Sequence, residues 1–117
     1  MQHQRAHIRY PVVPSLLVTQ GTQQQEEFGQ LLNLSERGLL LARAEAVESG
    51  SAWDLVVHCA QPVHGRECVR LAGQVRWCLP GGSEGRFDCG VQIKTIDRRD
   101  AEALGDLVNA VAMRAGS

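Results

Sequence analysis

Asn33, Ser35 and Gly38 lie in a short polar stretch between two leucine-rich runs, and their types suit the binding of a small ligand. Short apolar runs bounded by turn residues are typical of buried strands, so this stretch is expected to form the corner between two strands. Asn and Ser can hydrogen-bond nearby backbone groups, and Gly accepts backbone angles that a side chain would forbid. We predict that Asn33 and Ser35 point out of the corner beside exposed backbone N–H groups, which could bind an anion. An ordinary Asn/Ser turn is the alternative.

Arg5 and Arg9 form a second candidate group, in a basic segment that stops at Pro11 before the first apolar run. Because a proline disfavours helix at the preceding residue, Tyr10 is expected to enter the first strand in an extended conformation. Two arginines four residues apart can share one side of a helical turn or fork around a ligand. A solvated, frayed chain terminus is the alternative for the same residues.

The rest of the chain predicts the scaffold that holds these residues, which is a set of strands followed by one helix. Runs rich in Val and Leu, or with apolar and polar residues in alternation, indicate strands over residues 12–19, 27–34, 38–42, 53–59, 68–77 and 87–94. Pro14 suggests an edge or a bulge in the first of them. Residues 43–50 are expected to form one helical turn, and residues 61–65 a turn. Trp77 has the same core-facing parity as Val75.

The period of the pattern changes at Asp97, a residue type that caps helices well. Beyond it, one apolar stripe recurs at helical spacing, formed by Ala101, Leu104, Leu107, Val108 and Val111. Half-buried strands followed by one amphipathic helix predict a mainly β fold, which is a small antiparallel barrel or sandwich flanked by that helix. The pattern leaves open whether the helix packs on its own barrel or on a neighbour's.

The composition is that of one ordinary globular domain, with 44 % hydrophobic and 21 % charged residues. The apolar runs are shorter than the ~20 residues of a membrane span, and no secretory signal is visible, so a cytoplasmic location is expected. A net charge of −1 argues against general nucleic-acid binding, which needs a basic surface. The few aromatic residues also argue against an oligonucleotide-binding groove.

No residue pattern indicates a metal centre or an enzyme. The four cysteines have no C-x-x-C pair and are interpreted as small buried hydrophobic residues; they are Cys59, Cys68, Cys78 and Cys89. His3 and His7 have the spacing of helical metal ligands, but the segment offers no third ligand. Because the chain also lacks a nucleophile elbow and a glycine-rich phosphate loop, we expect neither catalysis nor a cofactor.

The two candidate groups together resemble the motif pair of the PilZ domain family, as Arg5-x-x-x-Arg9 and Asn33-x-Ser35-x-x-Gly38. Val75-Arg76-Trp77, Gly90-Val91-Gln92-Ile93 and the closing helix fit the same family, so the resemblance covers nearly the whole chain. It implies a six-stranded antiparallel PilZ-type β-barrel with a C-terminal α-helix. It also implies a flexible N-terminal arm (residues 1–10), the barrel (residues 11–96) and a helix of the same domain (residues 97–114).

The resemblance further implies that cyclic di-GMP binds between the arm and the barrel. Arg5 and Arg9 would contact the phosphates and the guanine edges or faces. Asn33 would contact a guanine edge and Ser35 a phosphate, while Gly38 would hold the turn and let the ligand come close. A planar guanidinium suits this ligand because it can pair with a phosphate, fork onto guanine O6 and N7, or stack on a base. The reshaped arm would signal through an unidentified protein partner.

Two further positions bear on the implied ligand. Gln4 stands where relatives that take a stacked ligand dimer often have another arginine, so one ligand per chain is expected. Trp77 stands where some relatives place an aromatic side chain near the ligand, although its parity favours the core. The alternative function is a ligand-independent PilZ-like interaction module in motility or pilus machinery, whose members usually lack the motifs.

Overall fold

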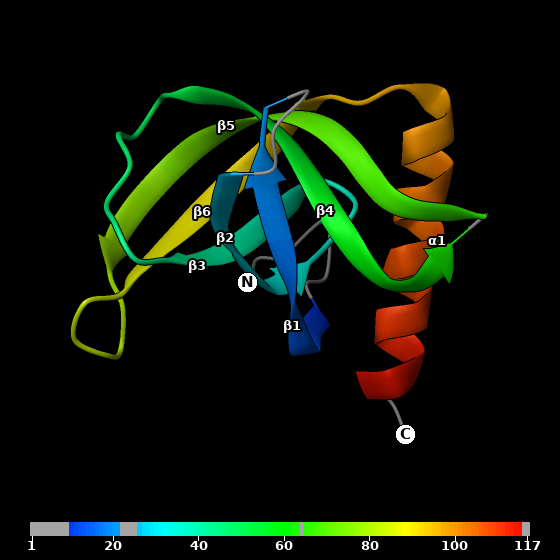
Figure 1. The fold of residues 1–117 in the computed structure, drawn as a ribbon, viewed down its shortest axis with the longest axis horizontal. Coiled ribbons are helices and arrows are strands. Elements are labelled where there is room, and N and C mark those ends of the chain that lie inside the picture. The colour runs from blue at the N-terminus through cyan, green and yellow to red at the C-terminus, as the bar shows by residue number, and fades with distance from the viewer. Residues whose placement is uncertain (1–9, 22–25, 64, 116–117) are drawn as a thin grey trace, which may run out of the picture.

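The computed structural model describes residues 10–21, 26–63 and 65–115, whose strands close into one barrel (Figure 1). The elements in chain order are β1 (Tyr10–Gln20), β2 (Glu26–Leu34), β3 (Gly38–Arg43), β4 (Ala52–Val63), β5 (Arg66–Pro80), β6 (Phe87–Thr95) and α1 (Arg98–Ala115). All paired strands are antiparallel, in the order β1-β2-β3-β6-β5-β4 around the barrel. This confirms the predicted six-stranded barrel with one C-terminal helix.

Leucine and valine side chains from every strand fill the barrel interior. Leu31, Leu39 and Leu41 on the neighbouring strands β2 and β3 are fully buried. The barrel closes where Val18 of β1 pairs with Val57 of β4, and both side chains are also fully buried. Each such side chain contributes about 1.5–3 kcal/mol when it leaves water, so alternating apolar residues make a rigid frame for the outer face.

Residues 44–50 form bends and a turn, so the predicted helical turn is wrong there. Two serine hydroxyls bind backbone carbonyl oxygens in and across this connection: Ser51 Oγ donates to Glu48 O at 2.6 Å, and Ser49 Oγ donates to Arg76 O at 3.0 Å. Serine hydroxyls that bond the backbone locally compete with a helix for the same groups. The segment therefore connects β3 to β4 without regular structure, and it lies beside the end of β5.

Register shifts occur in several strand pairs, and two of them bear on the predicted strands and turns. In β1 one shift lies between Pro11 and Leu16, which agrees with the bulge predicted from Pro14. In β4 a shift between His58 and Val63 lets the strand continue to Val63, through most of the predicted turn. The connection between β4 and β5 is therefore shorter than the sequence indicated.

α1 packs against its own barrel, on the side away from the loop between β5 and β6 (Figure 1). Its buried face consists of Ala103, Leu104, Leu107, Val108 and Val111. Ala101 is exposed, so its predicted place in the stripe is wrong, and Ala103 lies in the core instead. Among the described residues, no helix is both long and apolar enough to cross a membrane.

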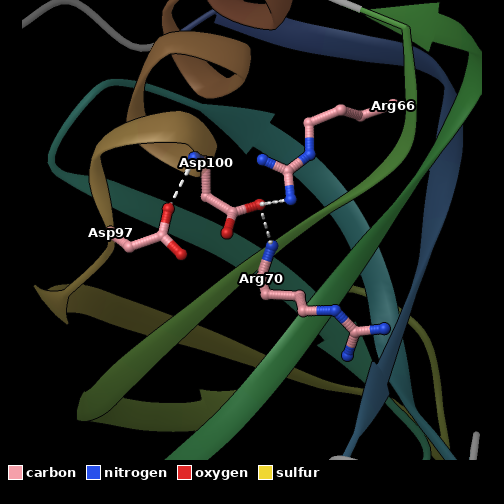
Figure 2. A network of polar contacts seen from close by, with 4 residues as sticks. All are labelled: Arg66, Arg70, Asp97 and Asp100. Carbon is pink, nitrogen blue, oxygen red and sulfur yellow. Dashed lines mark hydrogen bonds and ion pairs between the residues drawn. The ribbon is translucent and has the colours of Figure 1, made fainter.

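Four polar residues, here called the helix foot, fix the start of α1 to the barrel: Asp97, Asp100, Arg66 and Arg70 (Figure 2). Asp97 Oδ1 accepts a hydrogen bond from the Asp100 N–H at 2.9 Å, which confirms the predicted cap. Asp100 is 2 % exposed; its Oδ1 accepts the Arg70 N–H at 3.1 Å and lies 3.6 Å from Arg66 Nη2. The Arg70 side chain runs away from this carboxylate, which therefore binds the backbone of β5 and not the second guanidinium (Figure 2).

Candidate ligand-binding site

Residues 33–38, here called the motif corner, lead from β2 into β3, and Ser35 ties them together. Its Oγ accepts hydrogen bonds from the N–H groups of Arg37 and Gly38, both at 3.2 Å. Ser35 is 3 % exposed, so the prediction that it points outward beside exposed N–H groups is wrong. The short side chain of Ser35 folds back onto its own turn, so its hydroxyl oxygen accepts the Arg37 and Gly38 N–H groups itself. Its hydroxyl hydrogen has only a long contact, 3.5 Å to Gly38 O, and is the weakly engaged group of the corner.

Gly38 starts β3 with a backbone that other residues can also adopt. The described glycines with positive φ are Gly21, Gly50, Gly65 and Gly85, so the expectation of an unusual backbone at Gly38 is wrong. Gly38 is buried, and both of its backbone polar groups bond Ser35, through N–H to Oγ at 3.2 Å and through C=O to the Ser35 N–H at 3.0 Å. Gly38 is therefore fixed to Ser35 at both of its backbone polar groups.

Asn33 carries an unused hydrogen-bonding group. The residue is half-buried in β2, and its Oδ1 is buried without a hydrogen-bond partner among the described residues. Leaving a buried acceptor unpaired costs about 1–3 kcal/mol, which is why such atoms are rare in folded proteins and call for an explanation. The Asn33 amide therefore fits a ligand that brings a hydrogen-bond donor.

Asn33 begins a row of directly paired residues across the outer face of the barrel. It pairs with Leu40 of β3, Leu40 pairs with Gly90 of β6, and Gly90 pairs with Trp77 of β5. Leu40 faces outward, because both of its chain neighbours are fully buried and side chains alternate along a strand. The row thus combines an amide, an aliphatic side chain and an indole within three strand spacings of ~4.8 Å each.

Trp77 lies on this outer face and is 38 % exposed, so its predicted core-facing position is wrong. A register shift between Val75 and Trp77 puts an extra residue into β5, and a shift of one residue moves a side chain to the opposite face. The indole covers Gly90, where an added Cβ would lie 2.5 Å from Trp77 Cε2. Only glycine leaves room for the ring against β6.

Gly90 and a neighbouring polar pair are the parts of this face that the sequence reasoning did not assign. A glycine inside an alternating strand is itself a signal for close approach, here by the indole. Gln92 pairs with Gly38 across β6 and β3, and its Oε1 accepts a hydrogen bond from Arg76 Nη1 at 2.7 Å. Because of the bulge, Arg76 and Trp77 are both exposed although they are consecutive.

Arg5, Arg9 and Gln4 lie outside the described residues, but the structure describes where the chain enters the barrel. Tyr10 pairs with Leu34, and Pro11 pairs with Asn33. The first described residues of β1 therefore run alongside Asn33 and Leu34, at the start of the motif corner.

Other features of the described surface do not suit a nucleotide. A hollow of about 400 Å³ lies between the start of β1, the end of β4 and α1, but it is lined mainly by apolar side chains such as Val12, Pro62 and Leu107. Its lining includes one polar side chain, Gln61, and no arginine or lysine that could pair with a phosphate. Within the described ranges, no three His, Cys, Asp or Glu side chains gather closely enough to hold a metal ion.

The fold is similar to several solved structures at low sequence identity. The PilZ domain of YcgR from Escherichia coli, solved with c-di-GMP, matches with a TM-score of 0.72 and 12 % identity over 97 % of this chain and 95 % of that one. The K. pneumonia MrkH–c-di-GMP complex matches with a TM-score of 0.73 and 12 % identity, over 99 % and 56 % of the two chains. The Bacillus subtilis inhibitor of motility (MotI/DgrA) matches with a TM-score of 0.71 and 17 % identity, over 97 % of this chain and 51 % of that one.

The chain thus spans about half the length of the MotI/DgrA and MrkH chains and nearly all of the YcgR domain. A search of the curated proteins finds no match. The family model of the PilZ domain matches residues 3–110, a stretch that includes both motifs and all six strands. On this match and on the shared barrel, the chain belongs to the PilZ domain family.

Proposed function

We propose that this protein is a receptor for cyclic di-GMP, which binds on the outer face of the barrel between the motif corner and the N-terminal arm. The observation that carries the proposal is the buried, unpaired Oδ1 of Asn33, in a strand whose neighbour leads directly to the arm. The YcgR and MrkH structures were solved with c-di-GMP on the same fold, which supports this choice of ligand.

The guanine base supplies what the Asn33 amide lacks. Its Watson–Crick edge carries N–H donors beside a carbonyl acceptor, and an asparagine amide offers the complementary pair of one acceptor and one N–H₂ donor. Guanine N–H groups would satisfy the Asn33 oxygen, and the Asn33 nitrogen can donate to the guanine carbonyl. Binding would thus remove an existing penalty as well as add contacts.

Arg5 and Arg9 supply the charge that this ligand needs. A cyclic dinucleotide carries two phosphodiester charges, and guanidinium groups bind phosphates with charge-assisted, often bidentate, hydrogen bonds. An extended chain spans at most ~3.6 Å per residue, so five residues bring Arg5 within ~18 Å of Tyr10. Both guanidinium groups are then within reach of the row from Asn33 to Trp77.

Ser35 and Gly38 hold the base of the proposed site. The long contact of the Ser35 hydroxyl to Gly38 O leaves its hydrogen available for a phosphate oxygen, which is a better acceptor because it is charged. The small size of Gly38 allows a ligand to approach the backbone. Trp77 is proposed to stack on a guanine, because its indole covers Gly90 of β6 and the residue is still 38 % exposed. Gln4 is a further contact at the edge of the site.

The output is proposed to pass through the arm to a protein partner, so the protein is an adaptor and not an enzyme. Ordering loose residues opposes binding by ~1–2 kcal/mol for each residue fixed, so ligand binding and ordering of the arm would be one event. The arm and the messenger then form a new surface beside β2 and β3, which a partner can recognise.

Calorimetric titration of cyclic di-GMP into wild type and Arg9→Ala tests the proposal. Removal of a charged hydrogen bond costs about 1.5–3 kcal/mol, so Arg9→Ala should weaken binding by roughly tenfold to a hundredfold or more. Arg98→Ala is the matched control, because Arg98 is 91 % exposed on α1 and pairs only at 3.7 Å with Glu102. One ligand per chain is expected from Gln4. No heat with wild type would contradict the proposal and favour the ligand-independent interaction module.

A further inference from the structure

We propose that Cys78 and Cys89 form a thiol pair that hydroperoxides oxidise to an intrachain disulfide between β5 and β6. The two residues are direct partners across these antiparallel strands, and their Sγ atoms lie 3.2 Å apart. All four cysteines are free thiols in the structure. The pair belongs to no part of the proposed ligand site, so the inference does not depend on messenger binding.

The strand pairing brings the sulfur atoms within bonding range. Residues directly opposite each other on antiparallel strands have Cα atoms ~4.5–5.5 Å apart, inside the ~4.4–6.8 Å range found for disulfides. Their side chains also leave the same face of the sheet. The Cys78 and Cys89 sulfur atoms already touch at 3.2 Å, so a bond of ~2.0 Å needs a movement of only about 1 Å.

The two thiols have different surroundings, which divides the chemistry between them. Cys89 is fully buried, and burial followed by the hydrogen bond to Cys78 raises the pKa of Cys89 to about 12. Cys78 is half-buried and accepts hydrogen bonds from the Cys89 S–H and from the Val47 N–H at 3.4 Å. An oxidant from solvent therefore meets Cys78 first, while Cys89 waits behind it as the resolving thiol.

The oxidation proceeds in two balanced steps. The Cys78 sulfur attacks the O–O bond of the hydroperoxide, keeps one oxygen as a sulfenic acid, and the other oxygen leaves as an alcohol with the thiol proton. The Cys89 sulfur then attacks the Cys78 sulfur, the S–O bond breaks, and water leaves with the Cys89 proton. The two thiols together give the two electrons that reduce the peroxide.

The new bond would act on the row that includes Trp77. Opposite Cβ atoms are ~4.5–5.5 Å apart in such pairs, whereas a disulfide holds them at ~3.5–4.5 Å, so its closure draws β5 toward β6. Cys78 follows Trp77 in β5, and Cys89 precedes Gly90 in β6. Oxidation therefore tightens the strand pair directly beside the contact of the indole with Gly90. Thiol reductants can reverse such a bond by thiol–disulfide exchange.

The other two cysteines provide a matched comparison within the same chain. Cys68 of β5 pairs with His58 of β4, so Cys59 is not directly opposite to it. Cys59 is half-buried, and burial, then the nearby Cys68, raises the pKa of the Cys59 thiol. Cys59 and Cys68 are thus two half-buried thiols close to each other. They are not direct partners across the strands, as Cys78 and Cys89 are.

The experiment exposes the whole reduced protein to hydrogen peroxide, counts remaining thiols and maps linked peptides by mass spectrometry. Wild type and the Cys59→Ala/Cys68→Ala variant should both lose two thiols and yield the Cys78–Cys89 peptide. Dithiothreitol should then restore both thiols. The Cys78→Ala/Cys89→Ala variant should keep its two remaining thiols under the same exposure. If that double variant does not fold, Cys78→Ala alone, at a half-buried position, replaces it.

Four outcomes would each overturn the proposal: wild type that keeps all its thiols, a bond between Cys59 and Cys68, links only between chains, or a sulfinic acid at Cys78 with Cys89 still a thiol. The expected outcome is the reversible loss of one thiol pair. The same result in the Cys59→Ala/Cys68→Ala variant assigns that pair to β5 and β6.

Discussion

The motif corner and the helix foot are both polar clusters on one apolar barrel, but their hydrogen bonds end in different places. At the helix foot, one Asp100 oxygen receives the Arg70 N–H and lies close to Arg66 Nη2. At the motif corner, the buried oxygen of Asn33 receives nothing from the described residues. Polar clusters that satisfy themselves hold a fold together, whereas a buried acceptor left open is suited to another molecule.

At the helix foot, Arg66 Nη1 is also buried without a hydrogen-bond partner in the described part of the chain. The same guanidinium, however, lies beside the Asp100 carboxylate through Nη2. A charged group with one partner already has most of its electrostatic compensation, whereas the Asn33 oxygen has none. We therefore expect mutations at the two places to separate stability from binding.

The largest effect is expected for Asp100→Ala, on stability. It removes a buried carboxylate and leaves the Arg70 N–H and the Arg66 guanidinium without their acceptor. Breaking a buried charge pair costs about 3–5 kcal/mol, and the partial exposure of Arg66 reduces this to about 2–3 kcal/mol. Urea denaturation should show this loss, while the affinity of the folded protein for cyclic di-GMP stays unchanged.

Glu102→Ala is the control for that variant. Glu102 is 58 % exposed and lies 3.7 Å from Arg98 on the same helix, so its loss should change the free energy of unfolding by less than about 0.5 kcal/mol. If Asp100→Ala were no less stable than Glu102→Ala, the helix foot would not be what holds α1 in position.

The next effect in size is expected for Asn33→Ala, on binding. The variant should weaken the binding of cyclic di-GMP by roughly tenfold or more, since one hydrogen bond to a base edge contributes about 1–2 kcal/mol. Stability should not fall, because the deleted oxygen has no partner to lose. Calorimetry and urea denaturation of the same preparation separate the two quantities.

Asn109→Ala is the matched control, because Asn109 is an exposed residue of α1 far along the chain from the motif corner. It should bind as wild type does. An Asn33→Ala protein that binds equally well but has lost stability would reverse the comparison, and the Asn33 amide would then be structural.

The sequence predicted the barrel and helix because alternation and helical spacing act locally and report burial directly. The sequence could not show which polar side chain of the motif corner is left for a ligand, since Asn33 and Ser35 are both small polar residues in the same turn-like stretch. Only the tertiary structure reveals that Ser35 bonds its own turn while the Asn33 oxygen stays open. The helix foot was predicted only in part, because the Asp97 cap is local but the partner of Asp100 lies on β5.

The position of Trp77 was wrong for a different reason. Counting parity along β5 assumes a regular strand, and one inserted residue between Val75 and Trp77 reverses every later assignment. The signal that could have corrected it lies in another strand, where Gly90 makes room for the indole. Pairs of this kind require the register between strands, which a single sequence does not contain.

A smaller effect on binding is expected for Gly90→Ala. The added Cβ would lie 2.5 Å from Cε2 and 2.9 Å from Cζ2 of Trp77, so the indole must move off β6. If Trp77 stacks on a guanine, binding should weaken by about threefold to tenfold, part of the ~1–3 kcal/mol that such stacking provides. Titration followed by tryptophan fluorescence measures both the affinity and the ring's surroundings.

Gly82→Ala is the control for Gly90→Ala. A Cβ at Gly82 has nothing within 4 Å, so the loop between β5 and β6 should accept it without any change in affinity. Should the ring move in Gly90→Ala while affinity stays at the wild-type value, Trp77 would lie beside the ligand without stacking on it.

The smallest effect concerns the cap of α1 and depends on pH. The hydrogen bond from the Asp100 backbone N–H lowers the pKa of Asp97 from its ordinary value of 3.8, and it outweighs the partial loss of solvent, which acts in the opposite direction. A carboxylate with a lowered pKa stabilises the folded state fully above the unfolded value, and this contribution is lost as the pH falls below 3.8 through the folded value. Asp97→Asn keeps a good capping residue but cannot titrate.

The difference in urea midpoint between wild type and Asp97→Asn should therefore be constant from neutral pH down to about 4. It should then shrink toward zero as the pH falls further, because the protonated aspartic acid and the amide are both neutral caps at the positive end of the helix. A difference that stays constant through this range would mean that the charge of Asp97 contributes nothing to the helix foot, and that its cap depends on hydrogen-bond geometry alone. Cyclic di-GMP affinity at neutral pH should be the same in both proteins, since this end of α1 is bonded to β5 and not to the motif corner.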